Sequence, residues 1–143
     1  MTVYLDSSVV LRWLLQQPGA MDHWGDWDLA VTSALTRAEC RRNLDRLRVR
    51  GSLADRDVAN FALMLRATLG PVAHIPLTPA VLERAGAAFP TELGTLDAIH
   101  LATALAWIER REEPLLFLTH DRQLSLTAQA CGLDVAPPFP RRR

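Results

Sequence analysis

Residues 115–121 read Leu-Leu-Phe-Leu-Thr-His-Asp, and this stretch decides the fold. Its first four residues are apolar without a break, which is typical of a strand that is buried on both faces of a parallel sheet. Asp121 then begins an expected helix that runs to Cys131 and stops at Gly132, since Asp favours the start of a helix and Gly its end. A buried strand that passes into a helix within three residues indicates an α/β protein.

The same alternation continues outward from this stretch to both ends of the chain. The pattern predicts further strands over residues 3–5, 29–32, 72–75 and 133–136, and helices over residues 8–16, 36–50, 54–69, 78–89 and 95–110. Residues 20–28, which include Trp24 and Trp27, are expected to form an exposed loop. We therefore expect a central parallel sheet with helices on both faces and a functional site beyond the carboxyl ends of its strands.

Length and composition exclude several classes of protein. A chain of 143 residues predicts one domain, expected over residues 1–140, with a basic tail at residues 141–143. Sixteen basic residues balance sixteen acidic ones, so the strong positive field of a DNA-coating protein is absent. All of the basic residues are Arg, which excludes Schiff-base chemistry, a Lys general base and a phosphate-loop Lys.

The remaining composition indicates a cytoplasmic protein. Cys40 and Cys131 give neither a disulfide framework nor a zinc-binding spacing, and they fit a reducing compartment. No apolar run approaches the ~18–20 residues that a membrane span needs, and we expect no contact with a membrane. The sequence starts with a strand-like segment rather than a basic leader, so no signal peptide is expected.

Four acidic residues occupy the positions where a parallel sheet builds its site. Asp6 and Asp121 follow predicted strands, and Glu39 and Asp97 lie in the first turns of predicted helices. Carboxylates that meet at one sheet edge need a counter-charge, and the chain has no Lys to supply it. A divalent cation is the natural alternative, and oxygen ligands suit Mg²⁺ or Mn²⁺. Such an ion can activate water for attack on a phosphodiester.

Helix capping is the favoured explanation of each acid when it is considered by itself. Asp6 and Asp121 match N-caps, and Thr36-Arg-Ala-Glu39 matches a capping box. Asp97 can complement the dipole of its helix. Position in the sequence therefore leaves both a metal site and four capping residues open.

The segments around these acids are more specific than the acids alone. Val3-Tyr-Leu-Asp-Ser-Ser-Val-Val10 and residues 32–42 (Thr-Ser-Ala-Leu-Thr-Arg-Ala-Glu-Cys-Arg-Arg) surround the first two. Leu96-Asp-Ala-Ile-His-Leu-Ala-Thr-Ala104 and Leu118-Thr-His-Asp-Arg-Gln-Leu124 surround the others. In this order the four segments resemble the motifs of the PIN-domain family, most closely its small VapC-type toxins of toxin–antitoxin pairs.

The resemblance implies a metal-dependent endoribonuclease with a parallel sheet of strand order 3-2-1-4-5. It implies that Asp6, Asp97 and Asp121 hold Mg²⁺ directly or through water, and that Glu39 completes the cluster or orients the attacking water. Ser7 and Thr119 match positions that often supply a hydroxyl near the metal or the phosphate. Cleavage would leave a 5′-phosphate and a 3′-hydroxyl. The implied partners are RNA, a VapB-type antitoxin that inserts an Arg near the acids, and a second copy of the chain.

Several other residues have two interpretations each. His100 lies one turn after Asp97 and either contacts RNA or is a satisfied histidine on an apolar helix, which we favour. Arg37 and Arg41 form either a phosphate-binding patch beside Glu39 or a solvated basic face, the commoner case. Trp24 and Trp27 either stack on a base or an antitoxin side chain, or anchor their loop to the core.

Two other functions fit the same pattern. One is a PIN-like module that binds RNA or an antitoxin with little catalysis, although the complete set of four acids argues against it. The other is a PIN nuclease of RNA processing, which a neighbouring antitoxin gene would distinguish from a toxin. Other α/β families fit less well: a response-regulator receiver needs a Lys, and dehalogenase-like phosphatases need a second Asp where the chain has Ser8.

Overall fold

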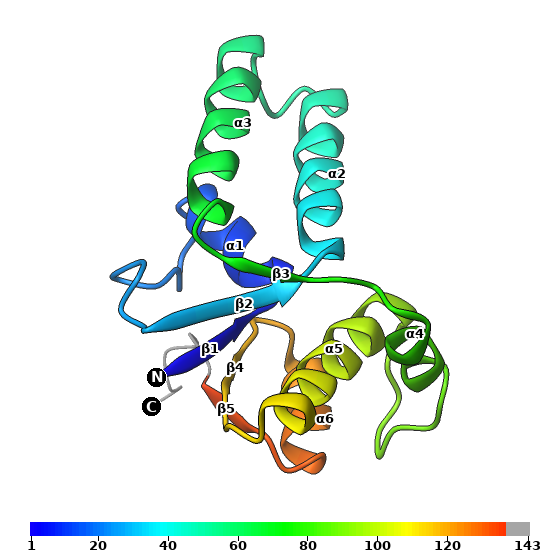
Figure 1. Ribbon diagram of the computed structural model, residues 1–143. Helices are drawn as coiled ribbons and strands as arrows, with labels where there is room; N and C mark the ends of the chain where they lie inside the picture. Colours follow the sequence, from blue (N-terminus) through cyan, green and yellow to red (C-terminus); the bar gives the residue numbers. More distant parts are fainter. Residues whose placement is uncertain (137–143) are drawn as a thin grey trace, which may run out of the picture.

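A five-stranded parallel sheet forms the centre of the computed structural model, which describes residues 1–136 (Figure 1). The predicted basic tail, residues 141–143, lies outside the described residues. The strands are β1 (Thr2–Leu5), β2 (Leu29–Ser33), β3 (Ala73–Ile75), β4 (Leu116–Leu118) and β5 (Asp134–Ala136). Their order is β3-β2-β1-β4-β5, and each neighbouring pair is parallel. The predicted α/β class and the strand order are confirmed.

Six helices cover the two faces of the sheet in the described chain. One face carries α1 (Ser7–Leu14), α2 (Leu35–Val49) and α3 (Asp55–Leu69), and Figure 1 shows α2 and α3 rising from it side by side. The other face carries α4 (Pro79–Ala85), α5 (Thr95–Arg111) and α6 (Arg122–Ala130). None of the helices described in residues 1–136 is long and apolar enough to cross a membrane.

Each face of the sheet has its own apolar core, which explains the unbroken apolar strands. Val3 and Leu5 of β1 pack into one core with residues of α1, α2 and α3. Tyr4 lies between them in sequence and packs into the other core with Phe117, Leu101 and neighbours on α5 and α6. Successive strand residues point to opposite faces, so a strand covered on both faces needs apolar residues at every position.

One of the predicted helices is too long. The helix expected over residues 78–89 ends at Ala85, because the chain leaves the helix at Gly86 and continues as a loop to Gly94. Residues 20–28 form the expected loop, and most of them are exposed, but Trp24 and Trp27 are partly buried. Trp24 stacks on Trp13 of α1 with ring centroids 5.3 Å apart, Trp27 meets Trp24 edge-on, and both pack against the first core. These residues therefore anchor the loop.

Candidate active site

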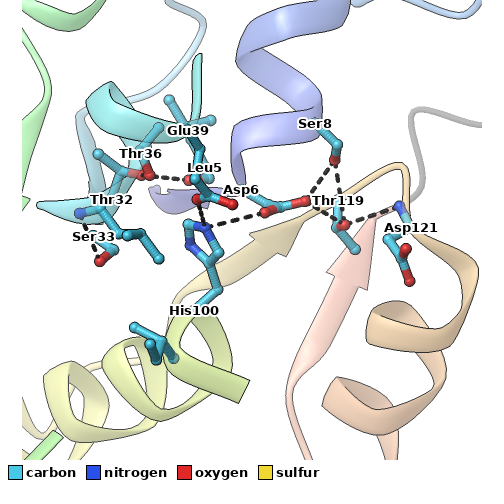
Figure 2. Close-up of polar contacts among 12 residues, drawn as sticks. Leu5, Asp6, Ser8, Thr32, Ser33, Thr36, Glu39, His100, Thr119 and Asp121 are labelled. Atoms are coloured by element: carbon cyan, nitrogen blue, oxygen red, sulfur yellow. Dashed lines mark hydrogen bonds and ion pairs between the residues drawn. The ribbon is translucent and has the colours of Figure 1, made fainter. Parts of the chain in front are cut away.

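Asp6 occupies the centre of the candidate site, at the carboxyl end of β1 (Figure 2). Its backbone N–H donates to the Leu118 carbonyl at 3.1 Å, which ties it to the end of β4. Although it is the N-cap residue of α1, its side chain makes no capping hydrogen bond. The buried carboxylate instead accepts from the Ser8 hydroxyl at 2.5 Å and from the Thr119 hydroxyl at 2.9 Å. Capping is therefore the wrong interpretation of Asp6.

Thr119 connects the ends of β1 and β4. Its buried hydroxyl donates to Asp6 and accepts from the backbone N–H of Asp121 at 3.0 Å. Asp121 does cap α6, since its Oδ1 accepts from the Leu124 N–H at 2.8 Å. A cap uses one carboxylate oxygen, so this role is compatible with a second role for the other oxygen.

Glu39 reaches the same region from α2. The predicted capping box is wrong, because α2 begins at Leu35 and Glu39 lies in its second turn. Thr36 is also unavailable as a cap, since its hydroxyl bonds with that of Thr32 at 2.6 Å inside the protein. The Glu39 carboxylate contacts Nε2 of His100 at 2.5 Å, in a half-buried position.

His100 joins Glu39, Asp6 and Tyr4. Its ring is fully buried, with Nδ1 2.8 Å from the Tyr4 hydroxyl and Nε2 3.5 Å from Asp6 Oδ1. Burial opposes a positive charge on this ring, but the hydrogen bond to Glu39 and the charges of Asp6, Glu39 and Asp97 outweigh it and raise the pKa of His100. A ring without exposed surface does not reach RNA, so the structure matches the interpretation as a satisfied buried histidine.

Asp97 shows that the four carboxylates share one electrostatic field. It lies in the first turn of α5, whose N-cap is Gly94, and its side chain is half-buried. Burial raises the pKa of Asp97 to about 6, with further increases from the charges of Asp121, Asp6 and Glu39 and an opposing effect of His100. Four segments that are far apart in the sequence thus bring like charges to one edge of the sheet.

The oxygen donors of this cluster suit a hard divalent cation, but the carboxylates do not yet lie close enough together to bind one. Carboxylate oxygens are the ligands that Mg²⁺ and Mn²⁺ prefer, and burial followed by the charges of Asp121, Asp6 and Glu39 raises the pKa of Asp97. Within residues 1–136, no three or more His, Cys, Asp or Glu side chains are grouped closely enough to hold a metal ion. Binding of Mg²⁺ would therefore require the carboxylates to move closer together.

The supporting residues divide into those that reach the cluster and those that do not. Thr119 contacts Asp6 directly, and His100 contacts Asp6 and Glu39. Ser7 is buried in α1, and no hydrogen bond of its side chain is found within the described chain. Arg37 is exposed near the start of α2 and forms no ion pair with any residue between 1 and 136.

Sequence reasoning missed two residues of this network. Ser8 supplies the hydroxyl that contacts Asp6, and it also accepts from the His120 N–H at 3.0 Å. Its spacing of two residues after an Asp is a known local hydrogen-bonding pattern and was the available signal. Tyr4 lies 96 residues before His100, so no local pattern indicates their contact.

Comparisons with known proteins show which proteins the chain is similar to. The family profile described as "PIN domain" matches residues 3–129. A protein of Mycobacterium tuberculosis named Ribonuclease VapC47 is 31% identical over 143 residues, which covers 95% of this chain and 96% of the relative. A second M. tuberculosis protein, named Ribonuclease VapC46, is 33% identical and covers 95% of this chain and 97% of its own length.

Proposed function

This chain belongs to the PIN-domain family, and from that premise we propose that it is a Mg²⁺-dependent endoribonuclease that acts as the toxin of a toxin–antitoxin pair. The observation that carries the proposal is the convergence of Asp6, Glu39, Asp97 and Asp121, because burial and then the charges of the other three acids raise the pKa of Asp97 to about 6. Such a concentration of negative charge is costly for folding and is common where a protein binds cations or performs catalysis.

Asp6, Asp97 and Asp121 would hold the ion, and Mn²⁺ would be able to replace Mg²⁺. When bound, the cation lowers the pKa of water and offsets the charge that develops on a phosphodiester. Glu39 is positioned to accept a proton or to orient a water molecule, because His100 fixes one of its carboxylate oxygens. The hydroxyls of Ser8 and Thr119 hold Asp6 in one orientation.

The remaining roles follow from the surroundings of each side chain. Thr119 orients the acids, and His100 positions Glu39 and Asp6 without contacting substrate. Arg37 contacts RNA phosphate from its exposed position, and Ser7 supplies a hydroxyl if the first turn of α1 shifts. Hydrolysis leaves a 5′-phosphate and a 3′-hydroxyl. We further infer a cytoplasmic homodimer that is neutralised by a VapB-type antitoxin.

The proposal is tested by Asp97→Asn in RNA cleavage assays with Mg²⁺, with Mn²⁺ and with a chelator. Loss of a ligand should lower the cleavage rate at least about a hundredfold, since a bound cation contributes several kcal/mol to the transition state. The thermal midpoint should stay unchanged or rise, because the amide removes the repulsion that raises the pKa of Asp97.

Asp134→Asn is the matched control, because Asp134 is exposed at the first residue of β5, at the opposite end of the strands. It should cleave RNA as the wild-type protein does. Full activity of Asp97→Asn in Mg²⁺ would overturn the site assignment. A folded wild-type protein that binds RNA but never cleaves it would favour the RNA-binding module instead.

A further inference from the structure

Helix α2 concentrates basic charge in a chain that is neutral as a whole. Between Leu35 and Val49 it carries five Arg residues against two acids, Glu39 and Asp45, and Arg50 follows as the C-cap. Asp45 pairs with Arg42 at 3.0 Å and with Arg48 at 2.7 Å. Within the part of the chain that the structure describes, the other four, Arg37, Arg41, Arg46 and Arg50, form no ion pair.

Helical spacing puts two of these four on the side of α2 that carries Glu39. Arg46 and Arg50 follow Glu39 by seven and eleven residues, which is close to two and three full turns. We call these two residues the α2 stripe. Arg37 and Arg41 are each two residues from Glu39, so they project from a different side of the helix. Both members of the α2 stripe are exposed.

The α2 stripe leads away from the candidate active site. α2 starts at the carboxyl end of β2 and rises from the sheet, and Glu39 points from it toward His100 (Figures 1 and 2). With a rise of ~1.5 Å per residue, Arg46 and Arg50 lie roughly 10 and 16 Å further along the helix axis than Glu39. They therefore lie beyond the carboxylate cluster, on the same side of α2 as Glu39.

We propose that the α2 stripe binds the phosphates of a single-stranded RNA segment next to the bond that is cut, an inference that rests on the proposed ribonuclease function. A cluster of four carboxylates repels the RNA backbone, so the substrate needs cationic contacts outside it. Guanidinium groups pair with phosphate oxygens through two parallel hydrogen bonds. Arg46 and Arg50 have no carboxylate partner within residues 1–136 to compete for those hydrogen bonds.

The test measures binding of a fluorescein-labelled single-stranded oligoribonucleotide to the full chain, by anisotropy in the presence of a chelator and over a series of salt concentrations. Each phosphate contact on a single strand adds ~0.7 to the slope of log affinity against log salt. Arg46→Gln/Arg50→Gln should therefore lower that slope by about 1.4. Over a fourfold increase in salt, the wild-type protein should lose about sevenfold more affinity than this variant.

Arg110→Gln/Arg111→Gln is the matched control for charge. Both residues are exposed in the last turn of α5, whose first turn holds Asp97, so they lie roughly 20 Å from that residue. This variant should keep the wild-type slope. In Mg²⁺, Arg46→Gln/Arg50→Gln should raise KM for the oligoribonucleotide and leave kcat within about twofold, since ground-state binding is what it removes.

Equal slopes for wild type and Arg46→Gln/Arg50→Gln would overturn the inference, as would an equal decrease in the Arg110→Gln/Arg111→Gln control. If the proposed ribonuclease function is wrong, a different measurement shows it. In that case the wild-type protein itself does not cut RNA in Mg²⁺ or Mn²⁺, whatever the slopes are. Cleavage by wild type together with unchanged slopes rejects only the role of the α2 stripe.

Discussion

At the scale of single residues, the site depends on hydroxyl groups as much as on carboxylates. Thr119 donates to Asp6 and accepts from the backbone of Asp121, so one side chain holds two of the four acids. Tyr4 and Ser8 act in the same way on His100 and Asp6. In the proposed mechanism, residues of this kind would affect catalysis through the orientation of the acids.

Thr119→Val tests this orienting role, because it keeps the shape of the side chain and removes the hydroxyl. We expect kcat to fall by about 10–100-fold, since misplaced ligands lower catalysis steeply. Thr127→Val is the matched control: Thr127 is equally buried, but its hydroxyl donates to the Gln123 carbonyl within α6 and meets the Thr91 hydroxyl rather than an acid. Similar kcat values for the two variants in a cleavage assay would show that Thr119 only supports folding.

Cys40 gives the protein a pH-dependent stability that is separate from catalysis. Burial in α2, together with the charges of Glu39 and Asp6, raises the pKa of this thiol to about 12. The unfolded chain loses the thiol proton above about pH 8.5, whereas the folded chain keeps it. The stabilisation is therefore complete below that pH and is lost progressively as the pH rises toward 12.

Urea unfolding at pH 8 and pH 9.5 measures this effect. The free energy of unfolding of the wild-type protein should fall by about 1 kcal/mol between the two values because of Cys40. Cys40→Ala should remove most of the decrease. Cys131→Ala should retain it, since Cys131 is only half-buried. A Cys40→Ala protein with the wild-type pH dependence would contradict this assignment.

At the scale of elements, the α2–α3 hairpin depends on one glycine. Gly51 follows the C-cap of α2 with φ +76°, a left-handed conformation that side chains other than Gly rarely adopt. A Cβ built there would meet no atom within 4 Å, so any cost of substitution comes from the backbone conformation alone. This turn connects the end of α2 that lies away from the sheet to the start of α3.

Gly51→Ala should destabilise the protein by about 1–2 kcal/mol, measured as the shift in the urea unfolding midpoint at constant slope. Gly86→Ala is its control, because Gly86 ends α4 with φ −81° and its Cβ would make only ordinary contacts, at 3.6 Å or more. That variant should be neutral or slightly stabilising. Equal losses of stability in both variants would contradict this prediction, because the left-handed conformation at residue 51 would then not be the cause of the effect.

At the scale of the whole molecule, ion binding and folding should be coupled. The four carboxylates come together only when β1, α2, α5 and β4 are assembled, so the unfolded chain has no equivalent site. Mg²⁺ at 100 times its Kd should therefore stabilise the fold by about 2.7 kcal/mol, or raise the thermal midpoint by roughly 5–10 °C. Asp97→Asn should lose most of this shift. An unchanged midpoint of the wild-type protein in saturating Mg²⁺ and Mn²⁺ would contradict the metal site independently of any cleavage assay.

Residue patterns predicted the element order and the parallel sheet, and they put each of the four acids at a strand end or near the start of a helix. These features depend on local periodicity and on rules for helix and strand ends. The rules correctly assigned a cap to Asp121, but they were wrong for Asp6 and Glu39, whose partners come from other segments. The helix predicted over residues 78–89 is longer than α4, because the prediction did not treat Gly86 as the end of the helix.

The contacts that hold the acids, and the other residues that take part in them, become visible in the folded chain and not in the sequence pattern. His100 contacts Tyr4 across 96 residues and Glu39 across 61, distances over which sequence spacing carries no information. The burial of Trp24 and Trp27 likewise depends on the stacking of Trp24 on Trp13 of α1, not on the polar residues beside them. Local residue preferences determine whether each segment forms a helix or a strand. A buried polar network forms only when distant segments pack together and exclude water from it.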